Sequence, residues 1–390
     1  MQTSRFFELH RTSCVLTVLT LLAGLCFSFP AFAKTTSTSA DQVVMMDYET
    51  GDILYSKNPH QKMPTSSMSK VMTMYLVFEA LRDGRLRLDD QLPVSEKAWR
   101  KGGSKMFVNV DTTVNVEDLI KGVIVQSGND ATIVLAEGLA GSEKMFAEAM
   151  TKKARELGMK NSNFTNASGW PDPEHYSTAY DLAVMARNLI REFPSYYDYY
   201  SIKEFTYNDI TQQNRNPLLY QNINADGIKT GHTRAAGYGL IASGTMNDRR
   251  VILVVNGLES KSERAREGKR LLSWGLRGFK NIDLFNEGDV ISEAKLLFGQ
   301  DPYVDLAAPS DVRVSITPHE IHNIRAEIKY EHPITAPVQK GDRIGRLVLD
   351  IPDREKTEFD LVSAENIDRV GFIQETLLKA GIMLSSSRKQ

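Results

Sequence analysis

Apolar and polar positions follow different periods in successive parts of the chain. From Val43 to Asn58, apolar runs on either side of a Thr50-Gly51-Asp52 turn predict two strands. Helical spacing follows, and the first helix has Thr65 or Ser66 as its expected cap. The expected helices cover Ser66–Arg82, Val116–Val125, Ala131–Leu139 and Glu143–Leu157, so the stretch from about Leu86 to Ser201 should be mostly helical.

Strand-like alternation then returns. Gly237–Leu258 predicts a hairpin around Asn247-Asp248, and Arg264–Arg277 predicts a helix. Because strands precede and follow a helical insertion, we expect an α/β (α+β) domain over residues 34–281. Its antiparallel sheet would be built from both ends of the domain.

The C-terminal third of the chain has a third pattern. Period-two runs separated by Pro and Gly, at Val312–Ile316, Ile324–Tyr330 and Ile344–Ile351, predict a small all-β sandwich over residues 282–364. Helical spacing resumes over Glu365–Leu384, with Val370, Ile373 and Leu377 near one face. We therefore expect an amphipathic helix within residues 365–390.

The first 33 residues have the pattern of a secretory signal peptide. Arg5 and Arg11 precede an apolar stretch, and Ala31-Phe32-Ala33 supplies a small-x-small cleavage site. An uncleaved membrane anchor is the alternative, but the apolar run is short for a membrane span. Cleavage would remove Cys14 and Cys26, the two cysteines of the chain, and with them thiol chemistry and cysteine-bound metals.

Charge argues against a nucleic-acid partner. The chain has 47 Lys and Arg against 49 Asp and Glu, a net charge of −2, so no basic excess exists to neutralise phosphates. His319-Glu320-Ile321-His322 is one residue short of the zincin helix motif and lies among expected strands. We expect no metal and no cofactor.

Three short motifs could carry chemistry. Ser67 and Lys70 are three residues apart on an expected helix, so the amine can reach the hydroxyl and act as its base. Ser127-Gly128-Asn129 lies between two expected helices, and Lys229-Thr230-Gly231 precedes the hairpin. Each motif alone also fits a solvated pair, a turn or a strand entry. Their order and contexts together match the set typical of penicillin-binding proteins and class A β-lactamases.

On these motifs the chain resembles the low-molecular-mass penicillin-binding proteins, the D-alanyl-D-alanine carboxypeptidases of the peptidase S11 family. The resemblance covers nearly all of the chain after the leader. It rests on PTSSMSKVMT, AWRKGGSKMF, GVIVQSGNDA, WPDPEHYSTAYDLA, DGIKTGHTRAAGY, SERAREGKRLLSWGLRGF and PITAPVQKGDRIGRL. It implies a β-lactamase/transpeptidase-like catalytic domain that acts on peptidoglycan stem peptides in the periplasm and is inhibited by β-lactams.

The resemblance also implies roles for single residues. Ser67 would attack the carbonyl of the penultimate D-alanine, Lys70 would be its base, and Ser127 would protonate the leaving amine. Asn129 would bind the substrate amide, Lys229 would supply positive potential, and Thr230 would contact the terminal carboxylate. The backbone N–H groups of Ser67 and His232 would form the oxyanion hole, the His232 side chain being dispensable. Arg264, or less favourably Arg215, would supply a cation for the carboxylate.

Several alternatives remain open at this point. A β-lactamase is disfavoured because Gly128 replaces Asp, no Glu-x-x-Leu-Asn stretch is present, and Glu174 looks structural. A D,D-endopeptidase using the same residues, and a non-catalytic peptidoglycan-binding protein, are the rivals of the carboxypeptidase. The terminal helix would attach the protein to the surface of the inner membrane, or else would pack on the β domain.

Overall fold

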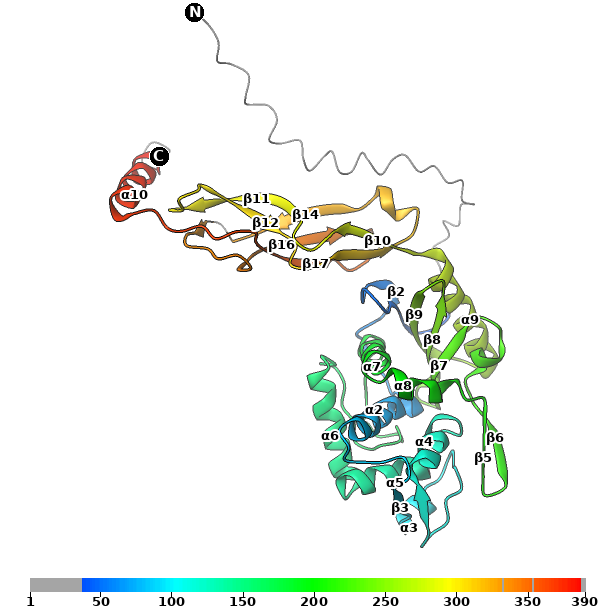
Figure 1. The fold of residues 1–390 in the computed structure, drawn as a ribbon. Helices are drawn as coiled ribbons and strands as arrows, with labels where there is room; N and C mark the ends of the chain where they lie inside the picture. The colour runs from blue at the N-terminus through cyan, green and yellow to red at the C-terminus, as the bar shows by residue number, and fades with distance from the viewer. Residues whose placement is uncertain (1–36, 332, 353, 387–390) are drawn as a thin grey trace, which may run out of the picture.

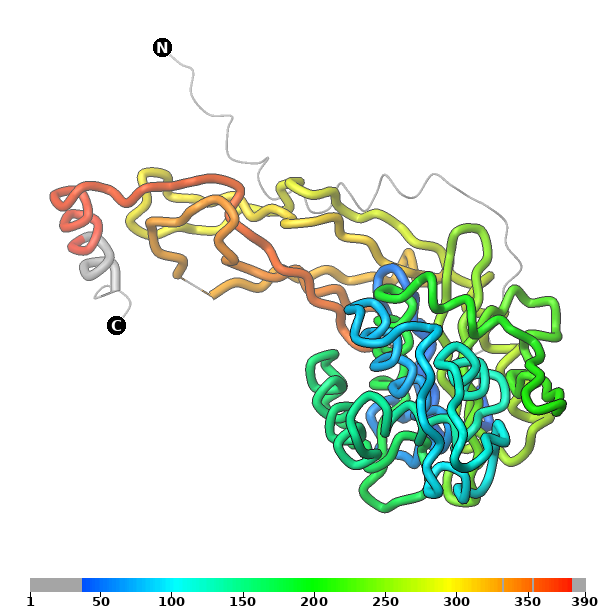
Figure 2. The backbone as a smooth tube through the Cα atoms, turned by 60° about the horizontal axis from the view of Figure 1, so that its bottom comes forward, coloured from blue at the N-terminus to red at the C-terminus, as the bar shows by residue number. Residues whose placement is uncertain are grey.

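The computed structural model of the protein describes residues 37–331, 333–352 and 354–386. The expected signal peptide and both cysteines lie outside them. The described chain has two parts, a larger α/β part and an elongated β part that extends from one end of it (Figure 1). The turned view shows the same arrangement, with the C-terminal helix at the far end of the β part (Figure 2).

The larger part is built around an antiparallel sheet of five strands in the order β2-β1-β9-β8-β7. β1 pairs with β9, so residues 42–47 lie beside residues 249–258, as the sequence predicts. The strands are β1 (Gln42–Asp47), β2 (Ile53–Lys57), β7 (Ala225–Thr233), β8 (Gly237–Met246) and β9 (Arg249–Leu258). The predicted hairpin turn at Asn247-Asp248 is confirmed.

Both faces of the sheet are covered. Helix α9 (Lys261–Gly278) buries Leu271, Leu272 and Leu276 against one face. Residues of α2 and α7 pack on the other face in the larger apolar cluster. The α/β prediction is therefore confirmed.

The helical insertion lies between β2 and β7. Its elements in chain order are η2 (Ser66–Ser69), α2 (Lys70–Arg82), β3 (Gln91–Pro93), α3 (Glu96–Arg100), β4 (Thr113–Asn115), α4 (Val116–Ile124), α5 (Asn129–Ala140), α6 (Glu143–Glu156), α7 (Ala179–Glu192), α8 (Pro194–Tyr197), η3 (Asp198–Ser201), β5 (Glu204–Tyr207), β6 (Ile210–Gln213) and η4 (Pro217–Tyr220).

The start of the first helix differs from the prediction. Residues Ser66–Ser69 form a 3-10 turn, and the α-helix begins only at Lys70. Neither expected residue caps it: Ser66 has φ +46°, and the Thr65 hydroxyl bonds Ser69 Oγ at 2.5 Å instead. The prediction failed because a 3-10 turn precedes the α-helix: the Thr65 hydroxyl bonds Ser69 within that turn, and the buried Ser66 hydroxyl has no hydrogen-bond partner among the described residues.

The β part joins the α/β part through β10. Its strands are β10 (Lys280–Phe285), β11 (Val290–Leu297), β12 (Tyr303–Ala307), β13 (Val312–Ile316), β14 (Arg325–Lys329), β15 (Ile334–Thr335), β16 (Arg343–Asp350) and β17 (Thr357–Ser363). β10 pairs with β13, and the other six form a second sheet in the order β14-β16-β17-β12-β11-β15. The turn η5 (Glu320–His322) carries the His-Glu-Ile-His stretch, where Glu320 pairs with Arg354.

The terminal helix begins later than its sequence spacing predicts. Helix α10 covers Phe372–Ser386, whereas Ile367 forms a bridge with Val338 and is buried in the β part. Val370 is buried there too, and its N–H bonds the carbonyl of Phe298. The prediction failed because apolar residues three apart can fill a sheet core as well as a helix face.

A buried arginine connects the two parts. Arg249 of β9 forms an ion pair with Asp47 at 2.9 Å and donates to Asn281 Oδ1 and Ser315 Oγ. Its guanidinium also lies 5.7 Å from the Phe279 ring centroid. One cation therefore links the central sheet to β10 and β13.

We predict that Arg249→Met lowers the free energy of unfolding by about 3 kcal/mol, because it leaves the Asp47 carboxylate buried without its partner. Urea denaturation followed by circular dichroism measures the change. Arg346→Met, which removes an exposed pair with Glu358, is the control and should have little effect. If both substitutions lowered the free energy of unfolding equally, that would contradict a special role of Arg249 in joining the α/β part to the β part.

Candidate active site

Ser67 and Lys70 come together where the 3-10 turn meets α2. Lys70 Nζ lies 2.9 Å from Ser67 Oγ, 2.8 Å from Asn129 Oδ1 and 2.7 Å from the carbonyl oxygen of Ser168. The lysine is fully buried, whereas Ser67 is half-buried. The hydroxyl thus faces accessible space while the amine is enclosed behind it.

Burial, together with the positive charge of Arg215, lowers the pKa of Lys70 to about 7. Asp130 opposes this shift, because its negative charge favours the protonated amine. A lysine with a pKa near neutrality is partly unprotonated at physiological pH. It can then accept the proton of a serine hydroxyl 2.9 Å away.

Ser127 and Asn129 reach the same place from the loop between α4 and α5. The Asn129 carboxamide accepts from Lys70 and donates to the carbonyl of Gly102 at 2.8 Å, so it orients the amine. Ser127 has φ +58° and a buried hydroxyl without a hydrogen-bond partner in the described part of the chain. That hydroxyl is free to take part in proton transfer.

Asp130 fixes the neighbouring loop. Its carboxylate accepts from the backbone N–H groups of Met106, Phe107 and Val108. The N–H of Asn129 in turn donates to the carbonyl of Ser104 at 2.7 Å. The start of α5 therefore holds residues 102–108 beside Lys70.

β7 contributes a second set of predicted residues. Lys229 and Thr230 are buried, and Lys229 Nζ lies 3.2 Å from the Thr230 carbonyl oxygen. Burial lowers the pKa of Lys229 well below its usual value, and the cations Lys70, Arg215 and Arg264 lower it further. The His232 side chain is exposed and stacks on the Tyr238 ring at 3.9 Å.

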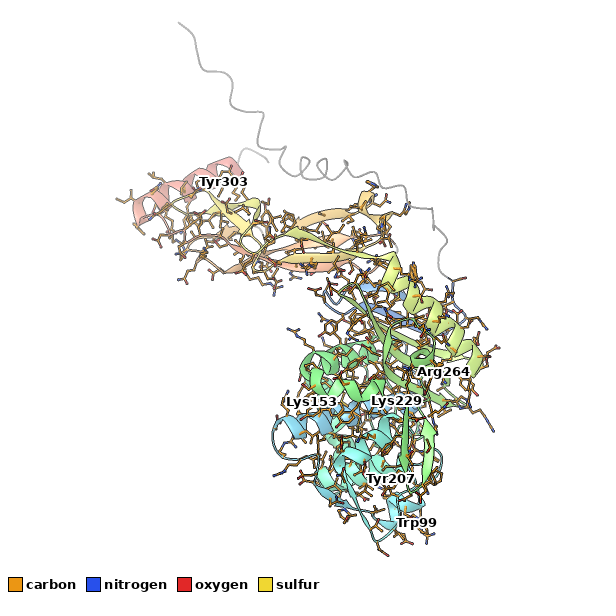
Figure 3. The ribbon with its side chains drawn as sticks, turned by 45° about the vertical axis from the view of Figure 1, so that its right-hand side comes forward. Trp99, Lys153, Tyr207, Lys229, Arg264 and Tyr303 are labelled. Atoms are coloured by element: carbon orange, nitrogen blue, oxygen red, sulfur yellow. The ribbon has the colours of Figure 1, made fainter. Side chains whose placement is uncertain are left out.

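Both candidate arginines lie at the site. Arg264 of α9 is buried, its Nη1 is 3.5 Å from the carbonyl oxygen of Gly231, and its Nε has no hydrogen-bond partner among the described residues. Burial lowers its pKa to about 10. Arg215 is exposed and donates to Ser104 Oγ. Figure 3 shows Lys229 and Arg264 in the α/β part of the molecule.

His175 is a site residue that the sequence reasoning missed. Its Nδ1 accepts from the N–H of Thr165 at 3.1 Å, so Nε2 carries the proton and donates to Ser69 Oγ at 2.7 Å. Burial lowers its pKa to about 4, which keeps the ring neutral. His175 thereby ties the 165–178 loop to the turn that carries Ser67. Its run PDPEHYST was recognised as family-like, but nothing in local spacing shows a contact with Ser69.

Two glycines allow the turn to be packed closely. A Cβ on Gly169, which has φ +76°, would lie 1.7 Å from the Ser66 carbonyl oxygen. A Cβ on Gly231 would lie 2.3 Å from Ser66 Oγ. The loop and β7 therefore both contact the residue before the nucleophile, which only glycine permits at these distances.

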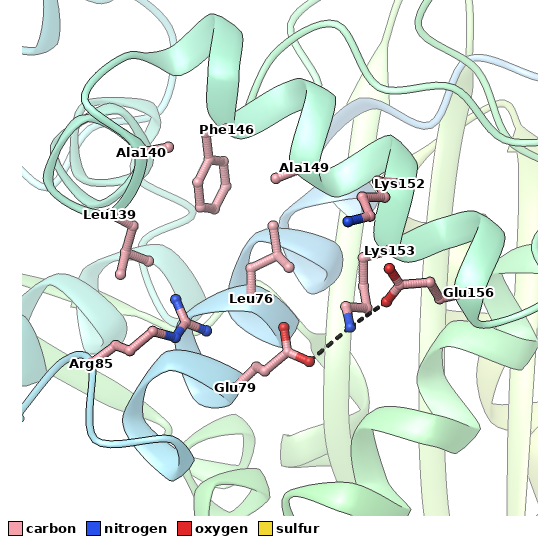
Figure 4. A pocket seen from close by; sticks show the side chains of 10 residues that line it. All are labelled: Leu76, Glu79, Arg85, Leu139, Ala140, Phe146, Ala149, Lys152, Lys153 and Glu156. Atoms are coloured by element: carbon pink, nitrogen blue, oxygen red, sulfur yellow. Dashed lines mark hydrogen bonds and ion pairs between the residues drawn. The ribbon is translucent and has the colours of Figure 1, made fainter.

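A cavity of about 240 Å³ on α2 is separate from these residues (Figure 4). Its apolar lining includes Leu76 and Phe146, and Lys153 bridges Glu79 and Glu156 at its edge. It contains none of the predicted site residues. Within the described ranges no group of three or more His, Cys, Asp or Glu side chains could hold a metal ion.

The arrangement defines a class of enzyme: a serine hydrolase with a lysine base, placed between an antiparallel sheet and a helical insertion. A sequence model described as D-alanyl-D-alanine carboxypeptidase, Peptidase S11, matches residues 30–260. A second, the penicillin-binding protein 5 C-terminal domain, matches residues 279–369. The chain belongs to the peptidase S11 family of D-alanyl-D-alanine carboxypeptidases.

Known proteins agree with this assignment. D-alanyl-D-alanine carboxypeptidase DacA of Haemophilus influenzae is 39% identical over 339 residues, which are 85% of this chain and 86% of the relative. The crystal structure of penicillin binding protein 5 from Haemophilus influenzae has a TM-score of 0.75 at 38% identity, covering 86% of this chain and all of that one.

More distant matches are informative too. The cefotaxime-bound penicillin-binding protein D2 of Listeria monocytogenes has a TM-score of 0.58 at 29% identity, over 63% of this chain and all of that one. The D-alanyl-D-alanine endopeptidase of Escherichia coli is 31% identical over 274 residues, 66% of this chain and 86% of the relative. The predicted carboxypeptidase family is confirmed, and the endopeptidase resemblance is the weaker one.

The depressed pKa of Lys70 predicts how the rate of acylation depends on pH. Below pH 7 the rate should fall about tenfold per pH unit as the amine becomes protonated, and above about pH 8 it should level off. Labelling by a fluorescent penicillin at pH 5 to 9 measures this. Arg215→Gln should move the midpoint upward, because it removes a cation that disfavours protonation of Lys70. A rate that does not change between pH 5 and 9 would contradict Lys70 as the base.

Proposed function

We propose that the protein removes the terminal D-alanine from peptidoglycan stem pentapeptides through an acyl-enzyme on Ser67. The observation that carries this proposal is the 2.9 Å contact between Ser67 Oγ and the buried amine of Lys70. A serine hydroxyl is a weak nucleophile without an adjacent base, and this amine has the geometry and the lowered pKa of one.

Acylation begins when Ser67 Oγ attacks the carbonyl carbon of the penultimate D-alanine and Lys70 takes the hydroxyl proton. The tetrahedral oxyanion accepts hydrogen bonds from the backbone N–H groups of Ser67 and His232. The C–N bond then breaks, and the proton held by Lys70 passes through the unpartnered hydroxyl of Ser127 to the leaving D-alanine amine, which leaves Lys70 neutral again. Water hydrolyses the ester and restores Ser67.

The terminal carboxylate binds at the cations on the β7 side of Ser67. Lys229 and Arg264 are both buried there, with Thr230 beside them and Arg215 close enough to lower the pKa of each. A carboxylate offsets the mutual repulsion of these cations. A D,D-cross-link also has a free carboxylate after its scissile bond, so the carboxypeptidase is favoured over the endopeptidase by the stronger similarity to carboxypeptidases.

β-Lactams fit the same scheme. Their ring amide takes the place of the scissile peptide bond and their carboxylate that of the C-terminus, so they acylate Ser67 covalently. The cefotaxime-bound relative supports this assignment for the fold.

We predict that Ser67→Ala abolishes both D-alanine release from a synthetic stem pentapeptide and covalent labelling by a fluorescent penicillin. The chain provides a matched control: Ser292 and Lys295 have the same spacing but lie on β11, and Ser292→Ala should change neither. Label retained in Ser67→Ala would place the nucleophile elsewhere. Labelling of wild type without D-alanine release would favour the endopeptidase.

For location, we propose export to the periplasm by residues 1–33 and attachment to the inner-membrane surface by α10. Its apolar side chains are unusually exposed, with Phe372 at 85%, Ile373 at 78% and Leu377 at 69%. Glu375, paired with Arg369 and Lys379, belongs to its polar side. Such a helix can lie in the interface with its apolar side in the lipid. No helix in the described ranges is long and apolar enough to cross a membrane.

Removal of residues 372–390 should therefore release the protein from phospholipid vesicles in a sedimentation assay. The cut follows Gly371 because Ile367 and Val370 belong to the β core. The full-length double variant Phe372→Asp, Leu377→Asp should behave like the truncated protein. Unchanged sedimentation of both would refute attachment through α10.

A further inference from the structure

An aromatic ring and an unpaired cation lie beside the site and have no role in the scheme above. Trp170 is a large apolar side chain that stays 42% exposed. The ammonium of Lys101 lies 4.3 Å from its ring centroid. In the described part of the chain this ammonium has no hydrogen bond or ion pair, because the nearby Glu143 pairs with Lys97 at 2.7 Å.

Trp170 borders the residues around Lys70, and Lys101 contacts only the Trp170 ring among the contacts described above. A Cβ on Gly103 would lie 2.8 Å from Asn129 Nδ2 and 3.1 Å from Trp170 Cζ3, so the ring and the Asn129 carboxamide border the same glycine. Trp170 also follows Ser168-Gly169, whose Ser168 carbonyl accepts from Lys70. The indole is therefore at the edge of the site.

The backbone of Trp170 is held in place by one side chain. The Asn166 side chain accepts from the N–H of Trp170 at 2.9 Å and donates to its carbonyl oxygen at 3.0 Å. The cation–π contact in turn holds the ammonium of Lys101 over the ring. A ligand group that binds here therefore meets a preorganised surface, which reduces the entropic cost of binding.

The direction of the substrate decides which group reaches this surface. In the proposed function the terminal carboxylate binds Lys229 of β7 and Arg264 of α9, which are both buried. Strand β7 approaches Ser66 from the side of the Ser66 hydroxyl. The 165–178 loop meets Ser66 at its carbonyl, on the side of Lys70 and Asn129. Asn129 and Trp170 border the same glycine, Gly103, and therefore lie together on this second side of Ser66.

We propose that Trp170 and Lys101 form a subsite for the stem residue upstream of the D-alanine pair. The ring packs against the aliphatic part of that residue, and the ammonium binds a carboxylate on it. This assignment rests on the proposed function, because it needs a peptide acylating Ser67. It makes the enzyme selective for acidic stem peptides over amidated ones.

The test compares two pentapeptides that differ only in a carboxylate or a carboxamide on the upstream residue, together with N-acetyl-D-Ala-D-Ala, which lacks that residue. The assays are run at pH 9, where Lys70 is unprotonated even without the charge of Lys101. There Lys101→Gln should lower kcat/KM about tenfold for the carboxylate peptide, the equivalent of one lost ion pair, and leave kcat/KM for the other two substrates unchanged. Trp170→Ala should raise KM for both pentapeptides but not for the short substrate, and Trp170→Phe should restore most of the loss.

The neighbouring pair supplies the control. Arg100 lies 5.4 Å from the ring of Trp99, also a partly exposed tryptophan, but pairs with Glu96. Arg100→Gln removes the same charge and should leave kcat/KM unchanged for all three substrates. Two results would overturn the subsite alone. One is an equal loss of kcat/KM on the two pentapeptides in Lys101→Gln, and the other is a loss in Arg100→Gln as large as that in Lys101→Gln. Wild type that releases no D-alanine from any substrate would overturn the proposed function and the subsite with it.

Discussion

The enclosure of one amine underlies the chemistry of this protein. Lys70 is fully buried and surrounded by acceptors from the turn before α2, the start of α5 and the 165–178 loop. Burying a cation costs free energy, and here that cost appears as a lowered pKa. The fold thus assembles three separate segments around one lysine, and the proposed role of Lys70 as a base depends on that assembly.

The same principle applies to the cations of β7 and α9. Lys229 and Arg264 are buried near each other and near Lys70, and their like charges disfavour protonation. Without a ligand this arrangement is electrostatically unfavourable. In the proposed function an anionic substrate would remove this conflict, so the cost of holding the cations together would become binding selectivity for a carboxylate.

Much of the fold and of the candidate site could be predicted from the sequence, wherever neighbouring residues carry the information. The hairpin around Asn247-Asp248 and the strand pair around Thr50-Gly51-Asp52 follow from alternation and turn residues. The order of Ser67, Ser127 and Lys229 with their motifs indicated the family. Local reasoning failed at two places: Thr65 bonds Ser69 within the 3-10 turn instead of capping α2, and Ile367 joins the β core through a bridge with the distant Val338.

The sequence by itself determined which elements form, which residues could be nucleophile and base, and which family the chain belongs to. Only the tertiary structure decided that Lys70 is buried and that its pKa falls to about 7, because the segments that enclose it include Ser168, 98 residues away along the chain. It also decided that His175 supports the nucleophile turn and that Trp170 lies beside Asn129. The reason is physical: desolvation and charge act through space, and a pKa depends on neighbours that sequence separation does not reveal.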